Sequence, residues 1–154
     1  IFLDAGSTVQ EIIPYLPENI VVVTNGFMNA GRCLERGIKT FLTGGMIKPT
    51  THALIGRGAI ESLRQYHFDK CFIGTNGIHH KFGFTTPDPE EAIIKHLAIT
   101  LSREAFVVAD HTKFKEVSFA KIADLHEATI ITDQLDEEEM QIYLNKTNIK
   151  VAST

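Results

Sequence analysis

The sequence predicts a single α/β domain built on an open, mainly parallel β-sheet with helices on both faces. Short β-branched runs alternate with stretches of helical periodicity, as expected for successive βα units. Several of the runs stop abruptly at small polar residues or glycine, the residue types that loops at strand ends require. The length of 154 residues suits one domain. Right-handed crossovers then place the helices on both sides of the sheet.

The expected elements follow one another along the whole chain. Strands are expected at 1–4, 20–24, 39–43, 69–74, 105–109, 128–132 and 149–152. Helices are expected at 7–16, 26–36, 55–66, 88–104 and 135–146, with a short one at 119–125. The segment 75–88 has no regular period and is rich in Gly, Thr, His and Pro, so we expect a functional or mobile loop that a ligand orders.

The first strand ends in Asp4-Ala5-Gly6-Ser7-Thr8. Ser7 or Thr8 can cap the orphan amides of the following helix, and capping alone explains these residue types. The same segment also suits a phosphate, because Gly6 lets the backbone approach a ligand and two hydroxyls lie beside exposed amides. The residues leave both interpretations open.

Three further strand ends carry similar residues. Thr24 and Asn25 follow the second strand, where Asn is a common N-cap. Gly45 follows the third strand and either makes a tight turn or frees space for a ligand. Asn76 and Gly77 follow the strand at 69–74. Because parallel strands bring their carboxyl ends to one edge, we expect a single composite pocket there.

The strand at 105–109 ends in Asp110, and Lys113 follows three residues later. Lys113 is either a solvated loop lysine or a cation facing an anion held by the other strand ends. Glu91 and Lys95 have the spacing of a surface ion pair. Their helix follows the 75–88 segment, however, so its first turns should border the pocket.

Several classes of site are disfavoured. His79 and His80 are adjacent, so their side chains diverge, and no third metal ligand stands at a suitable spacing. The chain has no nucleophile elbow, Walker loop or complete dinucleotide fingerprint, so we expect neither a metal nor a cofactor. The net charge of −4 argues against direct contact of this segment with nucleic acid.

Cellular context is also suggested by the sequence. Cys33 and Cys71 lie in apolar patterns and are expected to be buried thiols of a reducing cytoplasm. No apolar run approaches the roughly 20 residues of a membrane span. Because Ile1 already lies within a strand pattern, we expect this chain to be a fragment with a segment upstream.

The segments that carry a family resemblance, in order, are Asp4-Ala5-Gly6-Ser7-Thr8, Val23-Thr24-Asn25, Gly44-Gly45, Phe72–Ile78, Gly83-Phe84-Thr85-Thr86, the Glu91 to Lys95 pair, Val108–Phe114 and Ile130-Ile131-Thr132-Asp133. Together they resemble the effector-binding domain of DeoR-family bacterial transcriptional repressors. The resemblance implies a winged helix–turn–helix upstream that binds operator DNA, homo-oligomeric assembly, and a phosphorylated sugar effector that modulates both.

Fructose 1-phosphate and tagatose 6-phosphate are the leading effectors, because repressors of this type often govern phosphotransferase-system sugar operons. The residues expected to bind the ligand are Asp4, Gly6, Ser7, Thr8, Thr24, Asn25, Gly45, Asn76, Gly77, Thr85, Glu91, Lys95, Asp110 and Lys113.

The Rossmann-like fold that this family implies is itself similar to that of ribose-5-phosphate isomerase and CoA transferases. The isomerase's Gly-Ser-Thr loop and Asp-x-Ser-Lys segment resemble residues 6–8 and 110–113, which raises the alternative of an enzyme. Ile73 and Asn76 stand where the isomerase carries two aspartates, and neither can act as a base. We therefore favour a binding domain. A purely structural oligomerisation module would leave the polar strand ends unexplained.

Overall fold

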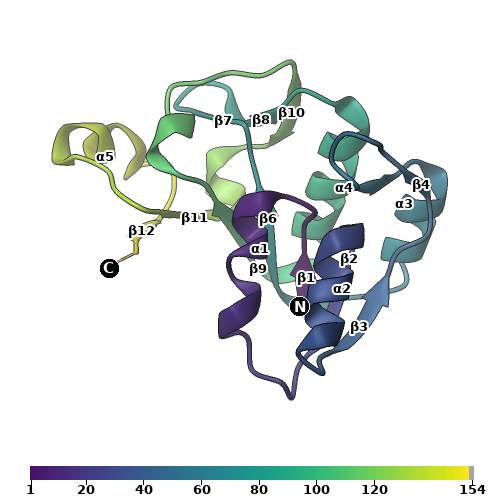
Figure 1. Cartoon of the computed structure of the whole chain (residues 1–154). Coiled ribbons are helices and arrows are strands. Elements are labelled where there is room, and N and C mark those ends of the chain that lie inside the picture. The colour runs from purple at the N-terminus through teal and green to yellow at the C-terminus, as the bar shows by residue number, and fades with distance from the viewer. Residues whose placement is uncertain (153–154) are drawn as a thin grey trace.

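The computed structural model describes residues 1–152 and is centred on a seven-stranded sheet. The strand order is β12-β11-β9-β6-β1-β2-β3, and every pairing is parallel (Figure 1). These strands are β1 (Phe2–Leu3), β2 (Val21–Thr24), β3 (Lys39–Leu42), β6 (Phe68–Gly74), β9 (Ser102–Val108), β11 (Thr129–Thr132) and β12 (Ile149–Val151). The predicted open parallel sheet is confirmed.

Helices cover both faces of this sheet, as predicted. They are α1 (Ser7–Gln10), α2 (Phe27–Glu35), α3 (Arg57–Leu63), α4 (Pro89–Thr100) and α5 (Glu137–Tyr143). Successive strand residues point to opposite faces. Leu3 and Val22 accordingly join Cys33 in a core cluster beneath α1 and α2. Phe2 and Val23 join the larger cluster, which includes buried residues of α3 and α4.

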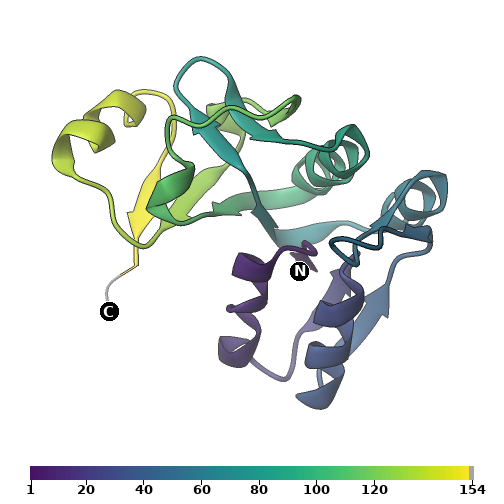
Figure 2. The ribbon, with the colours of Figure 1, turned by 45° about the horizontal axis from the view of Figure 1, so that its top comes forward.

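Two segments predicted as a loop and a helix form β-strands instead. The expected loop 75–88 contains β7 (Gly77–His79) and β8 (Gly83–Thr86), and the expected helix at 119–125 is replaced by β10 (Ala120–Ala123). These strands form a separate antiparallel sheet, β10-β8-β7, that packs against α4 (Figure 2). Their buried apolar residues join the larger core cluster. β8 pairs with β10 from more than thirty residues away, and local periodicity does not reveal such a partner. β7 and β8 form a local hairpin, but their strands of three and four residues are too short to show a clear period.

A short antiparallel hairpin between β3 and α3 was also not predicted. It consists of β4 (Met46–Ile47) and β5 (Leu54–Ile55). Its strands are two residues long, too short to show a period. Because β5 occupies the start of the helix predicted at 55–66, α3 begins later than expected.

Two other predicted helices are shorter than expected. The helix predicted at 7–16 is only α1 followed by a 3₁₀ turn around Pro14, which has no amide hydrogen to continue an α-helix. The helix predicted at 88–104 ends at Thr100, because Ser102 already pairs with Phe68 in the sheet. Further 3₁₀ turns lie at His111–Lys113 and Leu125–Glu127.

Cys33 and Cys71 are buried free thiols, as predicted. Burial raises the pKa of the Cys71 thiol to about 11, so the group stays neutral. Within residues 1–152, the helices are too short and too polar to cross a membrane.

Candidate functional site

A cavity of about 600 Å³ lies at the carboxyl edge of the parallel sheet. The segments after β1, β6 and β9 contribute to its walls, together with the start of α4 and the loop between β4 and β5. Eight of the predicted ligand-binding residues line it, namely Gly6, Ser7, Thr8, Asn76, Glu91, Lys95, Asp110 and Lys113. The ends of β1, β6 and β9 therefore form a composite pocket, but the expected contributions of Thr24, Asn25 and Gly45 from the ends of β2 and β3 are not found in its wall.

An ion pair between Asp4 and Lys95 lies at the floor of this cavity. The Asp4 carboxylate accepts hydrogen bonds from the amides of Ala5 and Gly74, each at 2.9 Å, and from the Lys95 ammonium. Lys95 also donates to the Gly74 carbonyl at 3.1 Å. The two side chains are only 2% and 7% exposed, so both charges are buried but hydrogen-bonded. This contact joins β1, β6 and α4.

A second group of charges lies at another wall of the cavity. Lys48, from the β4–β5 loop, reaches α4 and contacts Asp88 and Glu91, with each N–O distance 2.8 Å. These hydrogen bonds raise the pKa of Lys48 and lower that of Asp88. Asp88 also caps α4 by accepting the amide of Glu90. The contacts attach the hairpin to the helix.

Of the two interpretations of Glu91 and Lys95, the surface ion pair between them is contradicted. Although the two residues have the required spacing on α4, Glu91 pairs with Lys48 and Lys95 pairs with Asp4. Tertiary partners at the strand ends and in the hairpin replace the local one. Both residues nevertheless line the cavity, as their position after β8 suggested.

Hydrogen bonds between Asp110 and Thr112 hold the turn after β9, which also carries Lys113. Asp110 accepts the amide and hydroxyl of Thr112, and these bonds lower the pKa of Asp110. The ammonium of Lys113, which lines the cavity, forms no ion pair with any of residues 1–152. It is therefore available to an anion.

The same turn is braced from β11. Asp133 accepts the His111 amide at 2.8 Å and lies 3.0 Å from its ring nitrogen Nδ1. Desolvation would raise the pKa of Asp133, but the hydrogen bonds from His111 and from the Gln134 amide lower it to about 2. These bonds fix the backbone that carries Lys113.

The hydroxyls of Ser7 and Thr8 do not cap α1. The N-cap is Gly6, and no side chain makes a capping bond. Of the two interpretations left open by the sequence, capping is thus contradicted, and both residues line the cavity. Nearby, Asn76 accepts the Thr86 hydroxyl at 3.0 Å through its Oδ1, which leaves its amide donors for other contacts.

Asp4, Thr24 and Asn25 do not line the cavity, although all three were expected to bind ligand. Asp4 lies beneath the cavity floor, paired with Lys95 as described above. Thr24 accepts the Gly26 amide at 3.0 Å. Asn25 is not the N-cap of α2; its amide donates to the Leu54 carbonyl at 3.1 Å and joins the end of β2 to β5.

Gly45, Gly77 and Thr85 also lie away from the cavity wall. Gly45 has a φ of 116°, and a Cβ there would lie 2.6 Å from the Ile55 carbonyl oxygen. Gly77 is packed so closely that a Cβ would collide with the Glu116 carbonyl. The Thr85 hydroxyl accepts the Ser118 amide. The two glycines are therefore required by close backbone packing, and Thr85 supports the β10-β8-β7 sheet.

Several wall residues were not found by sequence reasoning: Gln10, Met28, Lys48, Thr50, Thr51, His52, Thr86 and Asp88. Half of them belong to the unpredicted hairpin loop. Asp88 had a usable signal, because an acid followed by proline marks the start of a helix. Lys48 had none. Among residues 1–152, no group of three or more His, Cys, Asp or Glu is arranged to hold a metal ion.

Comparison with known proteins gives consistent matches. Residues 1–134 match the family described as the DeoR C terminal sensor domain. The chain is 44% identical over 153 residues to the HTH-type transcriptional regulator FruR of Bacillus subtilis, covering 98% of this chain and 61% of FruR. It is 31% identical over 157 residues to the HTH-type transcriptional repressor GlcR of Bacillus subtilis, covering all of this chain and 60% of GlcR.

A further relative is the lactose phosphotransferase system repressor of Staphylococcus aureus, 28% identical over 156 residues that cover 98% of this chain and 61% of the repressor. The chain thus spans about three-fifths of the length of these relatives.

Proposed function

Because this chain belongs to the DeoR C-terminal sensor domain family, we propose that it is the effector-binding domain of a transcriptional repressor of a sugar-utilisation operon. Its effector is a phosphorylated sugar. The observation that carries this proposal is the cavity at the strand ends, where Lys113 has no ion-pair partner in residues 1–152 and the hydroxyls of Ser7 and Thr8 make no capping bond.

The phosphate is bound on the side of Lys113, Ser7 and Thr8. An ammonium provides charge, and hydroxyls and nearby backbone amides provide hydrogen-bond donors, which together satisfy phosphate oxygens. The absence of a side chain at Gly6 supports this assignment, because a Cβ there would have open space in front of it that a ligand can fill.

The sugar hydroxyls contact the remaining polar wall residues. Asn76 offers amide donors, and Asp110 and Glu91 offer carboxylate acceptors. Lys95 uses two donors on Asp4 and Gly74, so one of its three hydrogens remains for the ligand. Fructose 1-phosphate and tagatose 6-phosphate are the first effectors to test, since one relative is named a lactose phosphotransferase system repressor.

Calorimetry with each sugar phosphate and the corresponding free sugar tests the proposal. Charge-assisted contacts contribute roughly 1.5–3 kcal/mol each, so the phosphorylated compound should bind at least about a hundredfold more tightly. Equal affinities would contradict the phosphate assignment.

The relatives are named transcriptional regulators, which disfavours the isomerase alternative. Ile73 is fully buried in the core, and the Asn76 side chain is held by Thr86. Incubating the domain with aldose and ketose phosphates in deuterium oxide provides a check. Deuterium incorporated next to the carbonyl, above a boiled control, would show that a proton is being moved.

In the full-length protein, we expect an upstream winged helix–turn–helix to contact operator DNA within a homo-oligomer. Effector and operator binding should be coupled by about 1–3 kcal/mol, and the coupling must be reciprocal. Operator DNA should therefore change effector affinity by the same factor as effector changes operator affinity. Because the paired strands β7 and β8 replace the mobile loop expected at 75–88, unchanged protease sensitivity of this segment is compatible with coupling.

A further inference from the structure

The two sides of the cavity differ in charge. On one side, Lys113 and Asp110 both line the cavity and their charges balance, but the two side chains form no ion pair, and Lys113 pairs with no other carboxylate of residues 1–152. On the other side, Lys48 contacts both Asp88 and Glu91 at 2.8 Å. Two carboxylates face one ammonium there, so this acidic wall, defined as Lys48, Asp88 and Glu91, carries one net negative charge.

The acidic wall is separated from Lys113 by the architecture of the sheet. Lys113 follows the inner strand β9, whereas Lys48 lies in the hairpin that follows the opposite edge strand, β3. Along α4, Glu91 and Asp88 precede Lys95 by four and seven residues, which correspond to rises of about 6 and 10 Å. Since Lys95 is bonded to the end of β1, the acidic wall lies one to two helical turns above the cavity floor.

We infer that the acidic wall restricts the cavity to sugars with a single phosphate, an inference that rests on the proposed function. Asp88 and Glu91 accept hydrogen bonds from the hydroxyls at the end of the sugar remote from its phosphate. A second phosphate or a carboxylate at that end of the ligand is repelled by the carboxylates of Asp88 and Glu91. The Lys48 ammonium cannot offset this repulsion, because it is already paired with both carboxylates. Selectivity thus comes from repulsion of the wrong ligand.

The carboxylates are held in place as anions. Asp88 caps α4 and Glu91 lies in its first turn, where the partial positive charge of the helix favours negative side chains. The hydrogen bond from Lys48 lowers the pKa of Asp88. Glu91 is 13% exposed and Asp88 23% exposed, so water screens them only in part. The repulsion therefore persists near neutral pH.

Calorimetry with two matched ligand pairs tests the inference: fructose 1-phosphate against fructose 1,6-bisphosphate, and tagatose 6-phosphate against tagatose 1,6-bisphosphate. In the parent protein each bisphosphate should bind at least about tenfold more weakly than its monophosphate. The double variant Asp88→Asn with Glu91→Gln removes both charges with little change of shape, and Asn can still cap the helix. The affinity ratio should then fall below about threefold.

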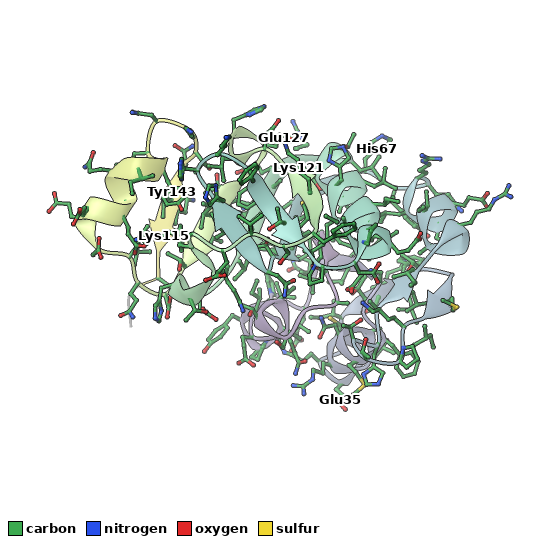
Figure 3. The ribbon with its side chains drawn as sticks, turned by 90° about the horizontal axis from the view of Figure 1, so that it is seen from above. Glu35, His67, Lys115, Lys121, Glu127 and Tyr143 are labelled. Carbon is green, nitrogen blue, oxygen red and sulfur yellow. The ribbon has the colours of Figure 1, made fainter. Side chains whose placement is uncertain are left out.

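A matched control removes two carboxylate charges elsewhere. Asp124 pairs with Lys121, and Glu127 accepts the Asp124 amide at 2.6 Å, in a group that does not line the cavity. Lys121 and Glu127 are labelled in Figure 3. The variant Asp124→Asn with Glu127→Gln should keep the parental ratio between monophosphate and bisphosphate.

Two results would overturn the inference. One is equal affinity of the parent for monophosphate and bisphosphate. The other is a parental ratio in the Asp88→Asn, Glu91→Gln variant, which would show that size rather than charge excludes the bisphosphate. If the double variant fails to fold, Glu91→Gln alone can be tested, because it keeps the Asp88 cap. This variant should reduce the ratio of monophosphate to bisphosphate affinity at least about threefold. Binding of none of the four compounds would instead contradict the proposed function, and with it the inference.

Discussion

The floor and the acidic wall of the cavity use the same chemistry in different surroundings. At the floor, Lys95 and Asp4 are 7% and 2% exposed. At the wall, Lys48 and Glu91 are 25% and 13% exposed. Breaking a fully buried pair leaves an uncompensated buried charge, whereas a partly exposed pair contributes less to stability. The comparison teaches that one lysine–carboxylate contact belongs to the fold, while the other is available for recognition.

The two contacts also connect different parts of the chain. The floor pair joins two central strands to α4 and carries the strand ends on which the cavity is built. The wall contact joins α4 to a hairpin attached through short strands and the Asn25 side chain. Substitutions at the floor should therefore act on folding, and substitutions at the wall on ligand selection.

The largest effect is expected from Lys95→Met. Removing the ammonium leaves the Asp4 carboxylate buried, which should cost about 3–5 kcal/mol of unfolding free energy. Chemical denaturation measures the loss. Lys121→Met is the matched control, because its pair with Asp124 is more than half exposed, and it should cost less than about 1 kcal/mol. Similar losses in both variants would remove the distinction between floor and surface pairs.

Lys113→Ala should act on binding alone. Loss of one charge-assisted phosphate contact should weaken effector binding by about 2 kcal/mol, near thirtyfold, with unfolding free energy within about 0.5 kcal/mol of the parent. Lys115→Ala provides the control, because Lys115 pairs with Glu139 outside the cavity and lies with Tyr143 near α5 (Figure 3). Parental affinity in the Lys113 variant would mean that this lysine is merely solvated.

Much of the fold was predictable because each strand of the seven-stranded sheet has a recognisable local sequence pattern. Neighbouring apolar residues such as Val22 and Val23, or Phe106 and Val107, are buried on opposite faces of the sheet, and their runs end at polar residues, so each strand can be recognised without knowledge of its neighbours. The small sheet was not visible in this way. The pairing of β8 with β10 joins residues more than thirty positions apart, such as Thr85 and Lys121, and their buried apolar residues have no distinctive spacing.

The site was predicted in part for the same reason. Residues that follow strands of the parallel sheet, such as Ser7 after β1 and Lys113 after β9, line the cavity, because parallel topology fixes where those strand ends lie. Lys48 was missed because a lysine in a short hairpin has no local mark of its partners. Thr24 and Asn25 were placed in the site because capping and backbone support use the same residue types as ligand binding.

Lys48→Ala should separate the wall from the floor. Because the wall groups are 13–25% exposed, more than the floor pair, the loss of Lys48 should cost about 1–2 kcal/mol of unfolding free energy, less than the loss expected for Lys95→Met. Proteolysis within residues 46–55 should nevertheless become faster, since the hairpin loses its tie to α4. Intact-mass analysis after limited proteolysis measures the rate of cleavage. A loss of unfolding free energy as large as that of Lys95→Met would mean that both contacts stabilise the fold equally, and the distinction between floor and wall would be wrong.

The smallest effect concerns Asp133, which is 51% exposed and therefore far more solvated than the floor pair. Its pKa is lowered to about 2, so its carboxylate stabilises the native state above its usual pKa of 3.8. That contribution is lost as pH falls from about 4 towards 2. Solvent screening limits this contribution to below about 1 kcal/mol.

Unfolding free energies of the parent and Asp133→Asn, measured at several pH values, should therefore differ at about pH 5 and converge at the acid end. His111→Ala keeps the backbone amides that bond the carboxylate, so it should retain part of this pH dependence. A difference between parent and Asp133→Asn that is constant across this range would mean that the carboxylate does not brace the turn carrying Lys113.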